Sequence, residues 1–146
     1  MNYNDVEILF IDDNLDDAAL TLHALKKGGV TNTVFHVKDG AEALDFMYCK
    51  GDFSNRNIDS QPKLILLDLK MPKVSGIEVL EKLKSDGHHK TVPVVVLTSS
   101  KEDPDVKKCY ELGANSYIVK PVESVSFFNT IKDLGLFWMK INLSPK

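Results

Sequence analysis

The chain has 146 residues, 43% of them apolar and 27% charged, which is typical of one globular domain with a sizeable core. Its mild net charge of -3 argues against a nucleic-acid binder, which needs a basic surface to neutralise phosphates. No signal peptide is visible and no apolar run approaches the roughly 20 residues of a membrane helix, so we expect a cytoplasmic protein. Cys49 and Cys109 lack the spacing of a disulfide or zinc pair and are expected to be free.

Short apolar runs alternate with segments of helical periodicity along the chain. The pattern predicts five strands, at 7–11, 33–37, 64–67, 92–97 and 117–119. Each is followed by a predicted helix, at 15–27, 41–48, 76–84, 105–112 and 123–138. The segment 50–62 is polar and too long for a tight connection, so we predict an exposed loop there. The residues around 136–146 are predicted to extend the last helix.

Five strand-then-helix units in succession predict an α/β fold with a parallel sheet, because each right-handed crossover returns its helix to the sheet. The strands are continuously apolar, which indicates that helices cover both faces. In an open parallel sheet, the carboxyl ends of all strands lie at one edge, where ligands bind. Polar residues that directly follow the strands are therefore the first candidates for a functional site.

Charged and hydroxyl residues stand at four of the predicted strand ends. They are Asp12 and Asp13 after the first strand, Asp68 after the third, Thr98 after the fourth and Lys120 after the fifth. Carboxylates brought this close repel one another unless a cation lies among them, and oxygen ligands suit a hard ion such as Mg²⁺. The ammonium and hydroxyl groups would bind the oxygens of an incoming anion. Together the residues predict phosphoryl transfer to a carboxylate.

Each of these residues also has an ordinary explanation. Asp12 and Asp13 fit the acidic start of a helix, where the helix dipole favours negative charge. Thr98 fits a cap of the following helix. Asp68 would then be a loop aspartate and Lys120 a surface lysine. Their joint occurrence at the predicted strand ends is what favours the functional interpretation.

Four segments resemble the response-regulator receiver family and together extend over nearly the whole chain. They are ILFIDDN at 8–14, LILLDLKMPKVSG at 64–76, VVVLTSS at 94–100 and GANSYIVKPV at 113–122. The resemblance implies a single receiver domain over 1–146, with a flavodoxin-like, doubly wound five-stranded parallel sheet in the order 2-1-3-4-5. It also implies a two-component phosphorylation switch, which catalyses its own phosphoryl transfer and slow dephosphorylation and is not otherwise an enzyme.

The resemblance assigns roles to individual positions. It implies that Asp68 accepts a phosphoryl group from a sensor histidine kinase, with Mg²⁺ as cofactor. Asp13 and Asp68 would bind the ion directly, together with the backbone carbonyl of Lys70. Asp12 would act on the ion mainly through water. Lys120 would pair with the phosphoryl oxygens.

The resemblance also implies how phosphorylation would change the surface. Thr98 would turn toward the phosphoryl group and Tyr117 would rotate inward behind it, repacking the surface around helix 105–112, strand 117–119 and the last helix. Tyr117 also fits ordinary aromatic packing in a strand. The Lys120–Pro121 peptide bond is expected to be cis.

Within the family, the chain most resembles single-domain regulators that serve phytochrome-type sensor kinases. The features are the long segment 50–62, the run at 94–100 and the Phe137–Trp138 pair. A phytochrome-type kinase is thus an expected partner, while the downstream target stays open. Phe137 and Trp138 have two interpretations: they cap the core, or they form a homodimer surface, since exposed aromatic patches often mark interfaces.

Three other functions share parts of this pattern. A phosphatase of the haloacid dehalogenase type also uses an aspartyl phosphate, but it needs a second aspartate where this chain has Lys70. A flavodoxin-like FMN carrier needs a phosphate-binding loop where this chain has Asp12 and Asp13. An adaptor that acts without phosphorylation would not need the full acidic set.

Overall fold

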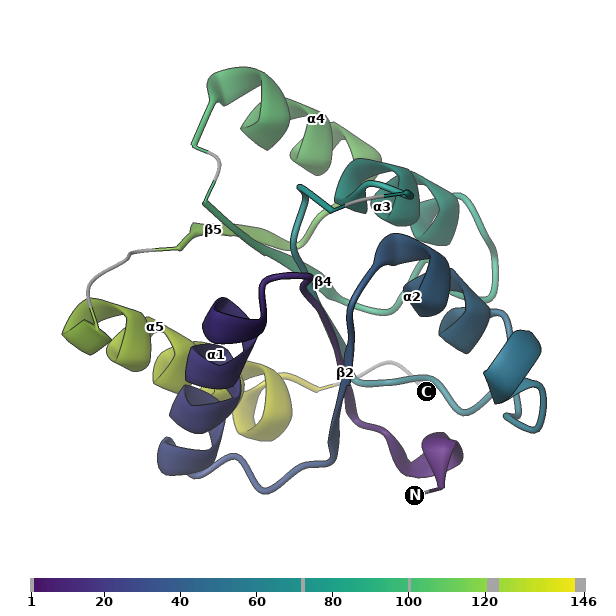
Figure 1. Cartoon of the computed structure of the whole chain (residues 1–146), viewed down its shortest axis with the longest axis horizontal. Helices are drawn as coiled ribbons and strands as arrows, with labels where there is room; N and C mark the ends of the chain where they lie inside the picture. Colours follow the sequence, from purple (N-terminus) through teal and green to yellow (C-terminus); the bar gives the residue numbers. More distant parts are fainter. Residues whose placement is uncertain (1, 72, 100, 121–123, 144–146) are drawn as a thin grey trace.

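The structure is a computed structural model and describes residues 2–71, 73–99, 101–120 and 124–143 (Figure 1). Five parallel strands form one sheet: β1 (Ile8–Ile11), β2 (Val34–Val37), β3 (Leu64–Leu67), β4 (Val94–Thr98) and β5 (Ser116–Val119). Their spatial order is β2-β1-β3-β4-β5. The predicted α/β fold and its strand order are therefore confirmed.

A helix follows each strand: α1 (Leu15–Lys27), α2 (Gly40–Met47), α3 (Gly76–Lys84), α4 (Asp103–Leu112) and α5 (Ser124–Leu136). Figure 1 shows α1 and α5 together on one side of the sheet, with α2, α3 and α4 on the other. Two short 3-10 turns are also present: η1 (Tyr3–Asp5) lies before β1, and η2 (Gly51–Phe53) lies after α2. In the described ranges, no helix combines the length and the apolar composition that crossing a bilayer requires.

Caps determine where the helices begin and end. Asn14, Asp39 and Ser75 each accept a hydrogen bond from a backbone N–H in the first turn of α1, α2 and α3. Helix α4 begins two residues earlier than predicted, with Pro104 in its first turn, where an N–H would have no helical partner. It ends at Gly113, whose φ of 106° is left-handed.

Alternating side chains along the strands build two hydrophobic layers. The layer beneath α2, α3 and α4 takes from the strands Leu9, Ile11, Val37, Ile65, Leu67, Val94 and Val96. The layer beneath α1 and α5 takes Ile8, Phe10, Leu64, Leu66, Val95 and Leu97. Because both faces are covered, the strands read as unbroken apolar runs. Cys49 and Cys109 are free, as expected.

Most of the segment 50–62 is exposed, but two side chains fasten it to the core. The ring of Phe53 meets the rings of Tyr3 and Phe46 edge to face, with centroids 5.0 and 5.2 Å away. The buried guanidinium of Arg56 lies 4.0 Å from the centroid of the Phe46 ring. It donates hydrogen bonds to the carbonyl oxygens of Phe46 and, at 2.7 Å, of Ser60. The segment is thus a structured connection between α2 and β3.

After α5 the chain forms a π-helical turn, η3 (Phe137–Ile141), where the sequence predicted a continuing α-helix. The rings of Phe137 and Trp138 meet edge to face, with centroids 5.1 Å apart. Trp138 packs against the layer beneath α1 and α5, whereas Phe137 is 45% exposed. Of the two aromatic residues, Phe137 therefore offers the larger apolar surface to solvent. Residues 144–146 of the expected extension lie outside the described residues.

Candidate functional site

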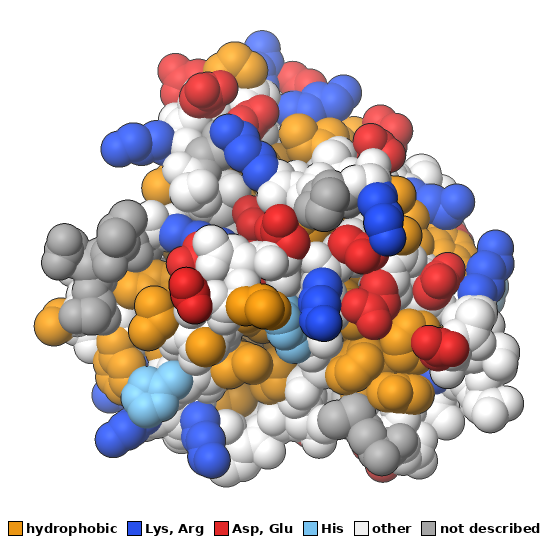
Figure 2. All heavy atoms as spheres, in the orientation of Figure 1, with side chains coloured by type: hydrophobic (Ala, Val, Ile, Leu, Met, Phe, Trp, Pro, Cys, Tyr) orange, Lys and Arg blue, Asp and Glu red, His pale blue; other side chains and the backbone are white. Residues whose placement is uncertain are grey.

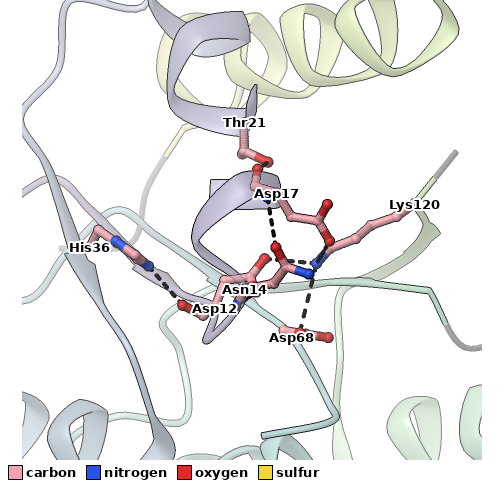
Figure 3. A network of polar contacts seen from close by, with 7 residues as sticks. All are labelled: Asp12, Asn14, Asp17, Thr21, His36, Asp68 and Lys120. Atoms are coloured by element: carbon pink, nitrogen blue, oxygen red, sulfur yellow. Dashed lines mark hydrogen bonds and ion pairs between the residues drawn. The ribbon is translucent and has the colours of Figure 1, made fainter. Parts of the chain in front are cut away.

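The predicted site residues come together at the carboxyl edge of the sheet. Asp12 and Asp13 follow β1, Asp68 follows β3, Thr98 ends β4 and Lys120 follows β5. Figure 3 shows the side chains of Asp12, Asp68 and Lys120 pointing toward one another. In Figure 2, acidic side chains gather across the middle of the visible face, around the edge where α1 and α2 begin. The topology thus joins residues that are more than a hundred positions apart.

Backbone contacts hold the turn after β1. The N–H of Asp12 donates to the carbonyl of Val37 at 3.2 Å, and Nε2 of His36 donates to the carbonyl of Asp12 at 2.8 Å. That carbonyl can only accept, so His36 carries a proton on Nε2. Oδ1 of Asp12 accepts the N–H of Asn14 at 2.9 Å. The second oxygen, Oδ2, contacts Lys120.

Asp68 lies in a tightly constrained turn between β3 and α3. Its N–H donates to the carbonyl of Ile11 at 2.9 Å. Gly76, the first residue of α3, packs directly on this turn: a Cβ there would lie 2.1 Å from the Asp68 carbonyl oxygen and 2.6 Å from Cα of Leu69. Only glycine fits this backbone-to-backbone contact. The residue eight positions downstream therefore helps to position the candidate acceptor.

The three carboxylates form a compact group. Asp12, Asp13 and Asp68 each offer one oxygen, and these oxygens lie within 4.8 Å of one another. Asp12 is fully buried, Asp68 is 7% exposed and Asp13 is exposed. Buried carboxylates this close favour a bound cation, and an all-oxygen set fits a hard divalent ion. The arrangement is an acidic triad with one side open to solvent.

Several opposing effects act on the pKa of Asp68. Burial raises the pKa of Asp68 above its ordinary value, the positive charge of Lys120 lowers it, and the negative charge of Asp12 raises it again. A hydrogen bond from the hydroxyl of Thr98 also lowers this pKa. The net result is a raised pKa, because a buried carboxylate close to another is costly to ionise.

Lys120 is surrounded by acidic groups. Its Nζ lies 2.7 Å from Oδ2 of Asp12, 3.1 Å from Oδ2 of Asp17 and 3.7 Å from Oδ2 of Asp68. Burial alone would lower the pKa of Lys120, but the hydrogen bond to Asp12 and the charges of Asp68 and Asp12 raise it. Lys120 is thus a fixed, buried cation beside the candidate acceptor.

The contact of Asp17 with Lys120 was not predicted from the sequence. Asp17 lies in the first turn of α1, where acidic residues are common because of the helix dipole, so its residue type carries no separate signal. Its contact with Lys120 spans 103 positions, which only the folded topology brings together. Figure 3 shows its side chain directed at the ammonium group.

The remaining predicted residues differ in their surroundings, and one lies outside the described residues. Lys70 is exposed, two positions after Asp68. Thr98 is fully buried. Tyr117 is half-buried, packs against the layer beneath α2, α3 and α4, and pairs with Val96 of β4. Pro121, and with it the expected cis bond, lies outside the described residues.

Comparisons with known proteins agree with this geometry. The family model described as "Response regulator receiver domain" matches residues 8–132. Response regulator Rcp1 of the cyanobacterium Synechocystis is 35% identical over 138 residues, which cover 94% of this chain and 92% of Rcp1. The crystal structure of its Mn²⁺-bound form has a TM-score of 0.88 at 34% identity, covering 95% of this chain and 98% of that one.

Two further structures are similar. The phosphorylated cyanobacterial phytochrome response regulator RcpA has a TM-score of 0.88 at 36% identity, covering 97% of this chain and 99% of that one. The bacteriophytochrome response regulator RtBRR is 49% identical with a TM-score of 0.76, covering 94% of this chain and 82% of that one. The range that the family model matches, 8–132, includes all five strands and the acidic triad.

Proposed function

Because the chain belongs to the response regulator receiver family, we propose that Asp68 is the phosphoacceptor of this two-component response regulator. A receiver of this kind accepts a phosphoryl group and is not an enzyme that turns over a separate substrate. The proposal rests on the placement of Asp68. Its carboxylate belongs to the acidic triad, accepts a hydrogen bond from Thr98 and lies 3.7 Å from the ammonium of Lys120.

The proposed reaction is a transfer from a phosphohistidine of the kinase. A carboxylate oxygen of Asp68 attacks phosphorus, the O–P bond forms, the N–P bond breaks and the histidine leaves with the electron pair. In this proposal Lys120 neutralises charge on the phosphoryl oxygens and the hydroxyl of Thr98 hydrogen-bonds one of them. The support is that both residues already interact with Asp68. Hydrolysis of the acyl phosphate later restores the carboxylate.

Receiver domains bind a divalent cation, and the acidic triad of this chain has the oxygen ligands for one. The homologue Rcp1 has been crystallised with Mn²⁺. We propose Mg²⁺ as the ion here, bound directly by Asp13 and Asp68 and by the backbone carbonyl of Lys70. Asp12, whose oxygens already contact Asn14 and Lys120, would act through water. When bound, the ion neutralises charge on the transferring group.

The proposed output is a rearranged protein-binding surface. Thr98 ends β4 and hydrogen-bonds Asp68, and Tyr117 lies on the neighbouring strand β5, on the sheet face that α2, α3 and α4 cover. We propose that Thr98 and Tyr117 move together on phosphorylation. The readout is intrinsic Tyr and Trp fluorescence with and without an acyl-phosphate donor. A Thr98→Val variant should form the adduct more slowly and, once phosphorylated, lack the fluorescence change.

The location proposed for this chain is the cytoplasm, and the proposed partner is a sensor histidine kinase of the phytochrome type. The support is the similarity to RcpA and RtBRR, whose names tie those two proteins to phytochromes. A radiolabelled phosphotransfer assay would compare a phytochrome-type kinase with an unrelated sensor kinase. Equal transfer rates from the two would contradict this choice of partner.

We also propose self-association through the end of the chain, where Phe137 is 45% and Ile141 71% exposed. Trp138 packs partly against the core, so Phe137→Ser tests the surface with less damage to the fold than Trp138→Ala. Sedimentation should show a concentration-dependent dimer that Phe137→Ser weakens while phosphorylation is unchanged. A monomer at all working concentrations, with and without phosphorylation, would contradict the proposal.

The acceptor itself is tested by intact mass. The protein is incubated with Mg²⁺ and a small acyl phosphate beside an Asp68→Asn variant. One phosphoryl adduct that requires Mg²⁺ and is lost in the variant is the expected result. An adduct that persists in the variant would assign the acceptor to another residue.

A further inference from the structure

The ammonium of Lys120 is shared unequally between the acidic groups around it. It lies within hydrogen-bond distance of Asp12 and Asp17, at 2.7 and 3.1 Å, but 3.7 Å from the carboxylate of Asp68. An ammonium has three N–H donors, and two of them are therefore used away from the proposed acceptor. The contact with Asp17 draws Lys120 toward α1.

We propose that Asp17 is a positioning residue: it holds Lys120 on the α1 side of the site and so restrains phosphorylation of Asp68. The inference rests on the proposed roles of Asp68 and Lys120. A phosphoryl group on Asp68 brings anionic oxygens that need N–H donors from Lys120. Because the side chain of Lys120 is only 7% exposed, water supplies little compensation. Asp12 and Asp17 leave one N–H of Lys120 unused, but a close contact with the phosphoryl oxygens needs Nζ to move away from α1, which stretches the contact with Asp17.

Two hydrogen bonds hold the backbone of Asp17 in place. Its backbone N–H donates to Oδ1 of the cap residue Asn14 at 3.0 Å, and its carbonyl accepts from the hydroxyl of Thr21 at 2.9 Å. Both contacts fix the first turn of α1, from which the carboxylate reaches Lys120 (Figure 3). The side chain is 39% exposed, so the ion pair with Lys120 can separate at modest cost.

The chain offers a matched control in Asp16, which lies in the same helical turn with the same charge but is exposed. Asp17→Asn keeps the size of the side chain and removes its charge, and Asp16→Asn makes the same change beside it. Any general effect of charge at the start of α1 appears in both variants. An effect that needs the contact with Lys120 appears in Asp17→Asn alone.

The experiment measures the phosphorylation rate at saturating Mg²⁺ over a range of acyl-phosphate concentrations, which separates the half-saturating concentration from the maximal rate. We expect Asp17→Asn to raise the ratio of maximal rate to half-saturating concentration about three- to tenfold, as expected for the loss of one partly screened ion pair. Asp16→Asn should stay within about twofold of the parent. Asp17→Glu, which keeps the charge, should restore the slower rate.

A second background separates positioning from simple repulsion of the anionic donor. In Lys120→Gln there is no ammonium to hold, so Asp17→Asn should change the slower phosphorylation rate by less than about twofold. An undiminished effect in that background would overturn the inference, as would equal rates for Asp17→Asn and Asp16→Asn. If the parent protein forms no adduct that depends on Asp68, the proposed function fails instead, which the intact-mass assay reveals separately.

Discussion

Lys120 and Arg56 are both buried cations, yet their surroundings differ in kind. Lys120 lies among the carboxylates of Asp12, Asp17 and Asp68. Arg56 instead donates to two backbone carbonyls and to the thiol of Cys49, and its guanidinium lies over the ring of Phe46. Burial lowers the pKa of Arg56, whereas the contacts of Lys120 raise its pKa despite burial. Lys120 is therefore surrounded by charged carboxylates, and Arg56 by the dipoles of backbone carbonyls.

The difference shows what each cation can do. Backbone carbonyls cannot move without unfolding the local chain, so the contacts of Arg56 hold segment 50–62 in place. Carboxylate side chains can rotate, bind a metal ion or accept a phosphoryl group, so the contacts of Lys120 can be exchanged. Substitutions at the two positions should therefore separate activity from stability.

The largest expected effect is on the transfer reaction. Lys120→Met should slow phosphorylation by a small acyl phosphate about 100-fold or more, because the developing charge on the phosphoryl oxygens loses its fixed cation. Rates from intact mass give the measurement. Lys27→Met, at the exposed end of α1, is the control and should react like the parent. Comparable rates in both variants would remove Lys120 from the reaction.

Arg56→Met should lower the stability of the fold and leave the phosphorylation rate unchanged. We expect the free energy of unfolding to fall by about 2–4 kcal/mol, since the carbonyls of Phe46 and Ser60 lose their donors and the ring of Phe46 loses its cation. Urea unfolding beside the exposed Lys50→Met measures the loss. The folded variant should phosphorylate at the parent rate. A strong loss of phosphorylation in the folded fraction would contradict a purely structural role for Arg56.

A smaller effect follows from the raised pKa of Asp68. Burial makes the neutral form of Asp68 more favourable in the folded chain than in the unfolded chain. This contribution to stability is present below the ordinary carboxyl pKa and is lost as pH rises through the raised value. In metal-free buffer at pH 7, Asp68→Asn should therefore stabilise the protein by on the order of 1 kcal/mol. Thermal unfolding from pH 4 to 8 should show the two proteins converging toward low pH.

The smallest expected effect is at the exposed ion pair between Lys63 and Glu7, 3.0 Å long and 45% and 33% exposed. Lys63→Gln should change the free energy of unfolding by less than about 0.5 kcal/mol, because solvent and salt screen the pair. Urea unfolding at low and high salt provides the measurement. A loss as large as that of Arg56→Met would mean that burial is not what separates these cations.

The strand ends could be predicted from sequence because the rule that governs them is local. An apolar run followed by a polar residue marks the edge of a parallel sheet, so the order of residues alone predicts that Asp12, Asp68, Thr98 and Lys120 lie together. The sheet order followed from the family resemblance and is confirmed. Errors at helix ends of one or two residues reflect fraying and caps.

Asp17 and Arg56 could not be predicted in the same way. Asp17 resembles any acidic residue in the first turn of a helix, and only its distance to Lys120 distinguishes it. Arg56 lies in a polar segment whose composition indicates solvent exposure, but the segment folds back so that the guanidinium reaches the carbonyl of Phe46. The π-helical turn at Phe137–Ile141 likewise has no signal in the periodicity.

The contact between Gly76 and the backbone of Asp68 limits which sequences this site tolerates. Even a methyl group at position 76 would overlap the Asp68 carbonyl, so Gly76→Ala must displace either the acceptor turn or the start of α3. No neighbouring side chain can absorb the overlap, because the colliding atoms are main-chain atoms. Random libraries that vary position 76 should therefore yield glycine alone among functional clones, although the residue carries no chemistry of its own.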